Sequence, residues 1–354
     1  MSRATVTTVA PSGPAHGAGS LGDDAVFHVW GPPGRGPRSR AFGQALGMDV
    51  VYVSASAKRG RLAALYKYPV QMVQTVRVLR RRRPRVVFVQ SPPSLAVMAS
   101  WIYAKSSGAR YVVDAHSCAM RSFWWTRPRW LHRGLTRDAA ATLVTNGTYA
   151  ASLAADGGRA LVIRDVPLDG DGAGPEPGEG FDVMVVNTFA PDEPLEEIVR
   201  AAEGLPEVTF HVTGDLRRIG GTPPPAPANV RFTGFLPDED YRALMASAGA
   251  VLCLTTHDDT MQRGACEALW AGRPIVTSDW ALLRDYFDAG TEHVDNSAAA
   301  IATAVRAIAA DPGRYERGIA ELQARRRSEW DGAMASLAAA IGTPAGRATT
   351  EDTR

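Results

Sequence analysis

The sequence predicts an α/β protein built from two doubly wound domains, and three observations carry this prediction. Short, largely uncharged runs rich in β-branched residues alternate with helical patterns, which is typical of a parallel sheet covered by helices on both faces. The alternation stops at a Gly-, Pro- and acid-rich segment, residues 169–180, and then starts again. Such a segment is typical of a linker. The length of 354 residues is also sufficient for two domains.

The first half of the chain alternates predicted strands with predicted helices. The strands are Phe27–Trp30, Val50–Val53, Val86–Val89, Tyr111–Asp114, Ala141–Val144 and Ala160–Ile163. The helices are Ser39–Leu46, Tyr68–Arg83, Ser94–Ser106, Pro128–Asp138 and Gly147–Ala155. The uncharged run from Val86 to Ala104 has nearly the length of a membrane span. Because Pro92 and Pro93 interrupt it, it predicts a strand, a loop and a helix instead.

The second half repeats the pattern and ends in two helices. Its predicted strands are Val183–Val186, Val208–Thr213, Val230–Thr233, Ala250–Leu254 and Pro274–Val276. Its predicted helices are Leu195–Ala202, Asp238–Ala246, Gly264–Trp270, Asn296–Ala310 and Pro312–Ile341. Gly272 and Pro274 are typical of a helix end followed by a new strand.

These patterns divide the chain into consecutive segments. They are a disordered lead-in over 1–22, an N-terminal domain over 23–168, the linker over 169–180, a C-terminal domain over 181–325, a helix over 326–342 and a disordered tail over 343–354. The lead-in has no apolar core of the kind that a secretion signal needs.

The composition excludes several classes of protein. With 45% hydrophobic and 21% charged residues, the chain is neither disordered, collagen-like nor disulfide-dense. The three cysteines, Cys118, Cys253 and Cys266, have no metal-type spacing, and so few cysteines favour a reducing compartment. We therefore expect a cytoplasmic protein.

The net charge of +2 is the sum of a basic first half and an acidic second half. Residues 1–180 hold 23 Lys and Arg against 11 Asp and Glu, whereas residues 181–354 hold 16 against 26. The basic cluster around residues 80–85, with nearby aromatic residues, predicts peripheral docking on an anionic membrane surface at the inner face. A solvated helix end is the alternative. No recognition motif or stacking platform for nucleic acid accompanies the charges, so we expect no nucleic-acid partner.

In open α/β sheets, ligands bind beyond the carboxyl ends of the strands. Candidate binding residues therefore follow the predicted strands, and they are Gly34, Arg38, Asp114, His116, Asn187, Thr188, Gly214, Asp215, Phe235 and Leu236. The loop over 31–40 contains no G-x-G-x-x-G motif, which argues against an NAD enzyme.

The most specific motif begins at Asp259. This acidic residue follows a strand, and Glu267 lies inside the next helix, which Gly264 opens. The N–H groups of Gly264 and Ala265 at this helix start can bind a phosphate. A carboxylate one turn later, Glu267, can accept two neighbouring ribose hydroxyls. A helix with an incidental glutamate is the alternative.

This segment resembles the sugar-nucleotide site of glycosyltransferases with the two-domain GT-B architecture, especially family 4 and its relatives. That family carries Glu-x7-Glu before an Ala-x-Ala-x-Gly-x-Pro ending, and the resemblance covers roughly residues 25–330. It implies two Rossmann-like domains facing across a cleft, and a nucleoside diphosphate sugar as co-substrate. It also implies that no metal and no cofactor is needed, and that the helix over 326–342 crosses back to the first domain.

The resemblance also implies roles for individual residues. Glu267 matches the glutamate that binds the nucleotide ribose. Asp259 occupies the position of the acid that holds donor-sugar hydroxyls, although its side chain is one methylene shorter. Phe235 and Leu236 lie in a segment that resembles the one whose backbone contacts the nucleobase edge. His116 matches a histidine that lies over the donor sugar.

One departure from the family concerns the leaving diphosphate. Many members have an arginine and a lysine after the first strand of the second domain, but residues 187–194 contain no cation. We expect Arg263, aided by the N–H groups of Gly264 and Ala265, to stabilise the diphosphate instead. A solvated surface arginine is the alternative.

A weaker likeness connects the chain to the chitobiosyldiphosphodolichol beta-mannosyltransferase family. It rests on residues 187–194, Gln90–Ser94 and Asp114–His116. This likeness implies inversion of configuration, with Asp114 as the candidate base, whereas the family 4 likeness implies retention, which we slightly prefer. The predicted catalytic residues are His116, Asp114 and Asp259.

The sequence thus predicts a metal-independent hexosyltransferase. It would move a sugar from a nucleoside diphosphate sugar to a lipid-linked, polysaccharide or other glycoside acceptor held by the basic N-terminal domain. A nucleotide-sugar epimerase of the same build and a non-catalytic scaffold subunit are the alternatives.

Overall fold

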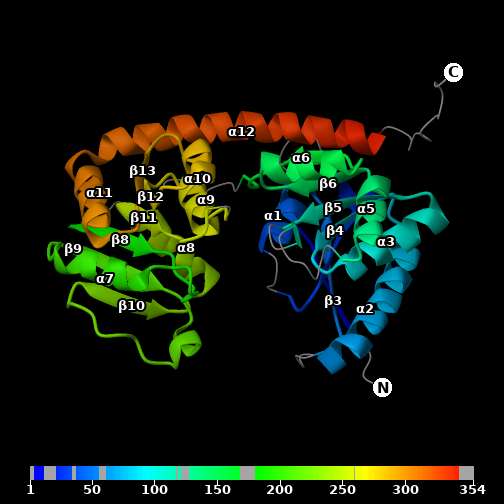
Figure 1. The fold of residues 1–354 in the computed structure, drawn as a ribbon, viewed down its shortest axis with the longest axis horizontal. Helices are drawn as coiled ribbons and strands as arrows, with labels where there is room; N and C mark the ends of the chain where they lie inside the picture. Colours follow the sequence, from blue (N-terminus) through cyan, green and yellow to red (C-terminus); the bar gives the residue numbers. More distant parts are fainter. Residues whose placement is uncertain are drawn as a thin grey trace. The chain divides into compact units, whose positions relative to one another are not determined.

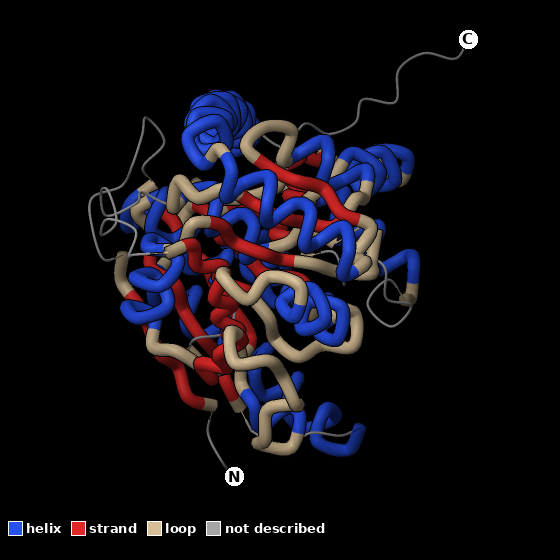
Figure 2. The backbone as a smooth tube through the Cα atoms, turned by 90° about the vertical axis from the view of Figure 1, so that its left-hand side faces the viewer, coloured by secondary structure: helices blue, strands red, loops and turns tan. Residues whose placement is uncertain are grey.

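The computed structural model describes residues 4–11, 21–33, 37–55, 61–116, 119–120, 127–167, 180–258 and 260–342. The chain forms two compact units. The N-terminal unit comprises Met1–Pro167 and Glu329–Arg354, and the C-terminal unit comprises Leu168–Ser328. Helices and strands alternate along the chain in both units (Figures 1 and 2). The predicted linker, apart from Gly180, and the predicted tail over 343–354 lie outside the described residues.

The N-terminal unit is built on a seven-stranded sheet with the order β1-β3-β2-β4-β5-β6-β7. The strands are β1 Thr5–Val9, β2 Ala25–Trp30, β3 Asp49–Ser54, β4 Val86–Ser91, β5 Arg110–Ala115, β6 Ala141–Val144 and β7 Ala160–Val162. The helices are α1 Pro37–Leu46, α2 Arg61–Arg82, α3 Ser94–Ser107, α5 Arg129–Asp138 and α6 Gly147–Ala155. Every predicted strand and helix of this half is present, and α2 begins earlier than predicted.

Strand β1 corrects the expectation of a disordered lead-in over residues 1–22. Thr5–Val9 pairs antiparallel with β3, whereas the other strand pairs of this sheet are parallel. Its β-branched residues favour a strand, and it covers an edge that β3 would otherwise leave open. The prediction missed it because this run lies outside the regular strand–helix alternation.

The sheet of the N-terminal unit is buried on both faces. Val87 and Val89 of β4 join the apolar cluster that includes residues of α3, whereas Phe88, between them, packs against Phe27 with ring centroids 5.9 Å apart. Side chains alternate between the two faces of a strand. A strand that is buried on both faces needs apolar side chains on both, which is why these strands are largely uncharged.

The C-terminal unit is built on a six-stranded sheet with the order β10-β9-β8-β11-β12-β13, in which all pairs are parallel. The strands are β8 Phe181–Val185, β9 Val208–Thr213, β10 Val230–Gly234, β11 Ala250–Cys253, β12 Ile275–Ser278 and β13 Thr291–Val294. The helices are α7 Leu195–Glu203, α8 Asp238–Ser247, α9 Arg263–Trp270, α10 Ala281–Tyr286, α11 Ala298–Ala310 and α12 Pro312–Gly342. The prediction missed α10 and β13, which are both short.

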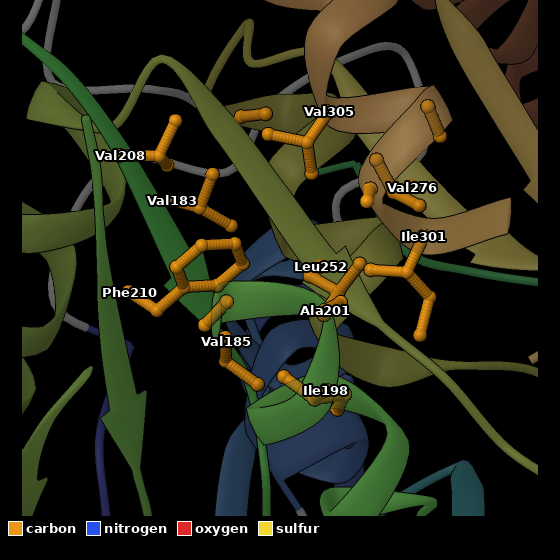
Figure 3. Packing of buried hydrophobic residues seen from close by; sticks show 14 of the residues in the cluster. Val183, Val185, Ile198, Ala201, Val208, Phe210, Leu252, Val276, Ile301 and Val305 are labelled. Atoms are coloured by element: carbon orange, nitrogen blue, oxygen red, sulfur yellow. The ribbon is translucent and has the colours of Figure 1, made fainter. Parts of the chain in front are cut away.

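Two apolar clusters cover the two faces of this sheet. Val183 and Val185 of β8 point to the cluster that Ile198 of α7 and Ile301 of α11 complete (Figure 3). Met184, between the two valines, points to the other cluster, which includes residues of α8, α9 and α10. The second face therefore carries the helix with the predicted motif.

Helix α12 begins in the C-terminal unit, and its residues from Glu329 onward belong to the N-terminal unit. Within the C-terminal unit, the buried Arg326 donates to the Tyr286 carbonyl oxygen at 2.8 Å. Within the N-terminal unit, the Trp330 ring lies 5.5 Å from the Phe42 ring. Among the described residues, no helix is long and apolar enough to cross a membrane, and residues 86–104 form β4, a loop and most of α3 as predicted.

Candidate functional site

Helix α9 starts very close to the carboxyl ends of β8 and β11. A Cβ on Gly264 would lie 2.6 Å from Val186 Cγ1 and 3.0 Å from Cys253 Sγ. Glycine is therefore the residue that lets α9 begin at this distance from the sheet. Glu267, one turn later, keeps 22% of its side chain exposed.

Both carboxylate oxygens of Glu267 accept hydrogen bonds within the protein. Tyr241 of α8 donates its hydroxyl to Oε2 at 2.9 Å, and Arg263 donates Nε to Oε1 at 2.8 Å. An ionised carboxylate offers about four acceptor positions, so a ligand can supply two further donors. Neighbouring hydroxyl groups fit this arrangement. The sequence prediction missed Tyr241, because it lies 26 residues before Glu267 in an ordinary amphipathic helix.

The first amides of α9 lie against the Cys253 sulfur of β11. Gly264 and Ala265 are both buried, and their N–H groups are directed at the Cys253 sulfur. Burial raises the pKa of Cys253 to about 12, and these two N–H groups oppose that rise. Phosphate binding by the Gly264 and Ala265 amides stays a prediction. Arg263, at the same helix start, is 32% exposed.

The loop after β8 is organised by the Glu193 carboxylate. It accepts hydrogen bonds from Thr188 N at 2.7 Å, Thr188 Oγ1 at 2.9 Å and Ala190 N at 3.0 Å. Asn187 is buried, and its Oδ1 accepts from Phe189 N at 2.7 Å. Phe189 has a φ of +55°, which few non-glycine residues adopt. The side chains of Asn187 and Thr188 thus shape this loop.

A cation reaches this loop from another part of the C-terminal unit. Arg218, in the short 3₁₀ helix Leu216–Ile219, donates Nη1 to the Thr188 carbonyl oxygen at 2.7 Å. The side chain is exposed at the carboxyl end of the sheet. Sequence comparison with the family, which has its cations directly after the first strand, could not reveal Arg218.

Gly214 joins three strand ends. Its φ is +131°, and a Cβ there would lie 2.5 Å from the Asn187 carbonyl oxygen. Its N–H donates to the Gly234 carbonyl oxygen at 3.1 Å. The ends of β8, β9 and β10 therefore meet at this glycine, on the carboxyl edge of the sheet, where ligands bind in open α/β sheets.

The other predicted residues at this edge differ in exposure. The Asp215 carboxylate is paired with Arg217 at 2.8 Å and accepts from the Arg217 N–H, so it caps the 3₁₀ helix. This pairing lowers the pKa of Asp215. Phe235, directly after β10, is 75% exposed, and Leu236 is partly buried. An exposed aromatic ring at a strand end can pack against a planar ligand group.

The loop after β11 is anchored by a buried polar network centred on Thr255. Thr255 Oγ1 donates to Asp192 Oδ2 at 2.8 Å, and Thr255 N donates to Ser278 Oγ at 2.8 Å. Asn296 Nδ2 donates to the Thr255 carbonyl oxygen at 3.0 Å. Asp259 follows in the same loop but lies outside the described residues, so its role stays a prediction.

In the N-terminal unit, the predicted residues Arg38, Asp114 and His116 are in contact. Arg38 Nε donates to Asp114 Oδ1 at 3.0 Å, and its two other nitrogens donate to the carbonyl oxygens of Ile163 at 2.6 Å and Arg164 at 3.0 Å. His116 Nε2 lies 3.3 Å from Asp114 Oδ2, without the geometry of a hydrogen bond. The exposed fractions are 12% for Arg38, 1% for Asp114 and 27% for His116.

This arrangement sets the charge of Asp114. Burial alone would raise the pKa of Asp114, but Arg38 and His116 outweigh it and lower the pKa to about 2. Such a carboxylate is a weak base, and it is almost fully buried. Asp114 is therefore suited to hold Arg38 and His116, and His116 is the exposed member. Gly34, the remaining predicted residue of this half, lies outside the described residues.

The predicted residues thus fall into two groups, one in each unit. Within the described ranges, no three His, Cys, Asp or Glu side chains are placed to hold a metal ion.

Comparison with protein families gives two matches. Residues 12–169 match the glycosyl transferase 4-like domain family, and residues 193–334 match the glycosyl transferase-like family. No curated protein matches the chain.

Solved structures share the fold at low sequence identity. Sucrose-phosphate synthase from Thermosynechococcus elongatus has a TM-score of 0.61 at 15% identity, covering 90% of each chain. HepE from Anabaena, in complex with UDP and glucose, has a TM-score of 0.63 at 16% identity, covering 90% of this chain and 99% of HepE. Trehalose 6-phosphate synthase from Burkholderia multivorans has a TM-score of 0.62 at 11% identity, with 90% and 99% covered.

These structures confirm the predicted fold class of two Rossmann-like domains. The chain therefore belongs to the glycosyltransferases with the GT-B architecture, with a glycosyl transferase 4-like domain in its N-terminal half and a glycosyl transferase-like domain in its C-terminal half.

Proposed function

We propose that the chain transfers a sugar from a nucleoside diphosphate sugar, bound by the C-terminal unit, to a lipid-linked or other glycoside acceptor, bound by the N-terminal unit. The observation that carries the proposal is the Glu267 carboxylate, held by Tyr241 and Arg263 at the start of α9. The HepE structures contain UDP, UDP-glucose, or UDP with glucose. This supports a uridine diphosphate sugar as the first donor to test.

The proposed donor site uses the strand ends of the C-terminal unit. Glu267 accepts the two ribose hydroxyls, and the exposed Phe235 lies against the base. The guanidinium groups of Arg263 and Arg218 stabilise the negative charge that develops on the leaving diphosphate. Asp259 binds hydroxyls of the donor sugar.

His116 is the proposed proton-handling residue of the N-terminal unit. Histidine titrates near neutral pH, which suits proton transfer at a hydroxyl. Its exposed fraction of 27% leaves the imidazole accessible, whereas Asp114 behind it is buried. We therefore assign Asp114 to orienting His116 rather than to direct proton transfer.

The proposed reaction needs neither a metal ion nor a cofactor. The diphosphate charge is met by protein guanidinium groups, and sugar transfer involves no redox step.

A thermal-shift panel tests the donor site directly. The full chain is heated with UDP, GDP, ADP or TDP, each in the presence of Mg²⁺ and again with EDTA. We expect one diphosphate to raise the Tm equally in both conditions, since a ligand at 100 times its Kd stabilises by about 2.7 kcal/mol. A shift that requires Mg²⁺ would contradict metal independence, and no shift with any diphosphate would contradict the donor site.

Turnover then separates the alternative functions. With the matching nucleotide sugar, we expect the diphosphate to be released only when a glycoside acceptor is present. Conversion of the donor into an isomeric nucleotide sugar without acceptor would indicate an epimerase. Binding without either reaction would indicate a non-catalytic subunit.

The acceptor class is supported by the surface of α2. Tyr66 and Val73 are 45% and 47% exposed, and Arg77, Arg80 and Arg81 are exposed as well. At 100° per residue these five positions lie on one face of the helix. Apolar and cationic side chains on one exposed helix face are typical of docking on an anionic membrane. We therefore propose peripheral binding to the membrane that holds a lipid-linked acceptor.

Charge reversal on this face tests membrane docking. In the triple variant R77E/R80E/R81E we expect affinity for phosphatidylglycerol vesicles to fall by about a hundredfold or more, because each cation near the surface contributes about 1 kcal/mol. Vesicle co-sedimentation measures this. The matched control reverses the charges of three arginines that are exposed in the C-terminal unit, Arg231, Arg314 and Arg317. It should bind the vesicles as wild type does. Equal losses in both variants would refute a specific role of α2.

A further inference from the structure

Tyr241 connects two parts of the proposed donor site. It lies in α8, which follows Phe235 and Leu236 after Pro237, and its hydroxyl donates to Glu267 of α9 at 2.9 Å. The ring packs against the apolar cluster that α8 and α9 share on one face of the sheet, together with Met245 and Leu269 (both helices are labelled in Figure 1). The position of the hydroxyl is therefore set by packing.

The Tyr241 hydroxyl acts as a donor to Glu267 over a wide pH range. Burial, followed by the negative charge of Glu267, raises the pKa of Tyr241 well above its usual value of 10. The phenol therefore stays protonated. It cannot become a second negative charge beside the carboxylate.

The two donors to Glu267 have different origins. Arg263 is four residues before Glu267 on the same helix and is 32% exposed, so its hydrogen bond to Glu267 stays within α9. Tyr241 comes from a different helix and is mostly buried. Since the two donors use different carboxylate oxygens, the Tyr241 hydrogen bond fixes the rotation of the carboxylate about its last bond.

We propose that Tyr241 is a positioning residue for the nucleotide. It holds the Glu267 carboxylate in the orientation that accepts both ribose hydroxyls, and it thereby sets the preference for ribonucleotides over nucleotides without the 2′- and 3′-hydroxyls. This inference rests on the proposed function, because it adds a residue to the same donor site.

The test compares two ligands with two proteins. Kd values for UDP and for 2′,3′-dideoxy-UDP are measured by calorimetry with wild type and Tyr241→Phe. We expect UDP to bind about tenfold more weakly to the variant, as befits the loss of a hydrogen bond to a charged group. The Kd of dideoxy-UDP should stay unchanged. If another nucleoside diphosphate binds in the thermal-shift panel instead of UDP, the measurement uses that diphosphate and its 2′,3′-dideoxy form.

The matched control is Tyr315→Phe. Tyr315 donates its hydroxyl to Glu292 in the same unit, so this variant also removes a tyrosine–glutamate hydrogen bond, and both Kd values should match wild type. Tyr241→Met, which also lacks the hydroxyl, replaces Tyr241→Phe if the latter is poorly folded.

Three results are informative. A loss confined to the ligand with ribose hydroxyls supports the positioning role. Unchanged UDP affinity in Tyr241→Phe, or equal losses for both ligands, overturns it while leaving the donor site in place. Failure of wild type to bind any diphosphate, or unchanged binding in Glu267→Ala, overturns the proposed function itself.

Discussion

Glu267→Ala is expected to weaken nucleoside diphosphate binding by a hundredfold or more and to remove turnover at ordinary donor concentrations. Two hydrogen bonds from ribose hydroxyls to a carboxylate are lost, and each is worth about 1.5–3 kcal/mol. The variant also leaves the Tyr241 hydroxyl without its acceptor, since that hydroxyl donates to Glu267 Oε2 at 2.9 Å. We therefore expect a lower Tm of the free protein, by the equivalent of about 1–2 kcal/mol.

Ligand-induced shifts must be compared with the Tm of each protein without ligand. Calorimetry gives the Kd directly and separates binding from stability. The matched control is Glu292→Ala, which removes another glutamate that accepts from a tyrosine, Tyr315. This control should lose stability but keep its affinity. Glu267→Ala with wild-type affinity would contradict the assignment of Glu267 to the ribose.

Asp114→Asn is expected to destabilise the protein by about 3 kcal/mol at pH 7, because it removes the partner charge of a largely buried arginine. Arg38 is 12% exposed, and Asp114 is 1% exposed. In the variant, the Arg38 guanidinium keeps the carbonyl oxygens of Ile163 and Arg164 as acceptors but has no negative charge beside it. Turnover should also fall, since Asp114 Oδ2 lies 3.3 Å from His116 Nε2.

The pH dependence of this effect has a definite sign. The pKa of Asp114 is lowered from an ordinary 3.8 to about 2 in the folded protein. Its charge therefore contributes about 2 kcal/mol of stability above pH 4. This contribution is lost as the pH falls from 4 through 2, where the folded carboxylate becomes protonated. Wild type should thus lose stability over this range, and Asp114→Asn should lose less.

Urea unfolding at pH 7 and pH 3 measures both effects. The matched control is Asp138→Asn, which removes a carboxylate paired with Lys105 at 2.9 Å but 39% exposed. Exposed pairs contribute up to about 1 kcal/mol, so the control should cost much less at pH 7. Equal stability of Asp114→Asn and wild type at pH 7 would show that the buried pair is not stabilising.

Much of the fold could be predicted from local patterns of apolar and polar residues in the sequence. Uncharged runs of valine predict buried strands, because strands such as β4 and β8 have apolar neighbours on both faces. The predicted strands of the N-terminal half are all present, and β8 to β12 follow the predictions closely. Short elements with weak patterns escaped prediction, namely β1, β13 and α10. Strand β1 pairs with β3, a contact between distant residues that a local pattern does not report.

The sequence also predicted the helix on which we propose the donor site. The spacing from Asp259 to Glu267 and the Gly-x-Pro ending are local features, and they point to α9. The residue types on the strand ends, such as Asp114 and His116, could be selected because the carboxyl ends of parallel strands share one edge of a sheet.

What the tertiary structure decided is which of these groups are paired. Tyr241 meets Glu267, Arg218 reaches Thr188, and Arg38 neutralises Asp114, at sequence separations of 26, 30 and 76 residues. The Gly264 and Ala265 amides at the start of α9 lie against the Cys253 sulfur, which belongs to β11. Sequence periodicity reports only on neighbours within one helix or strand. Partners from different elements are brought together by strand order and helix packing, so their charges and pKa values are set only in the folded chain.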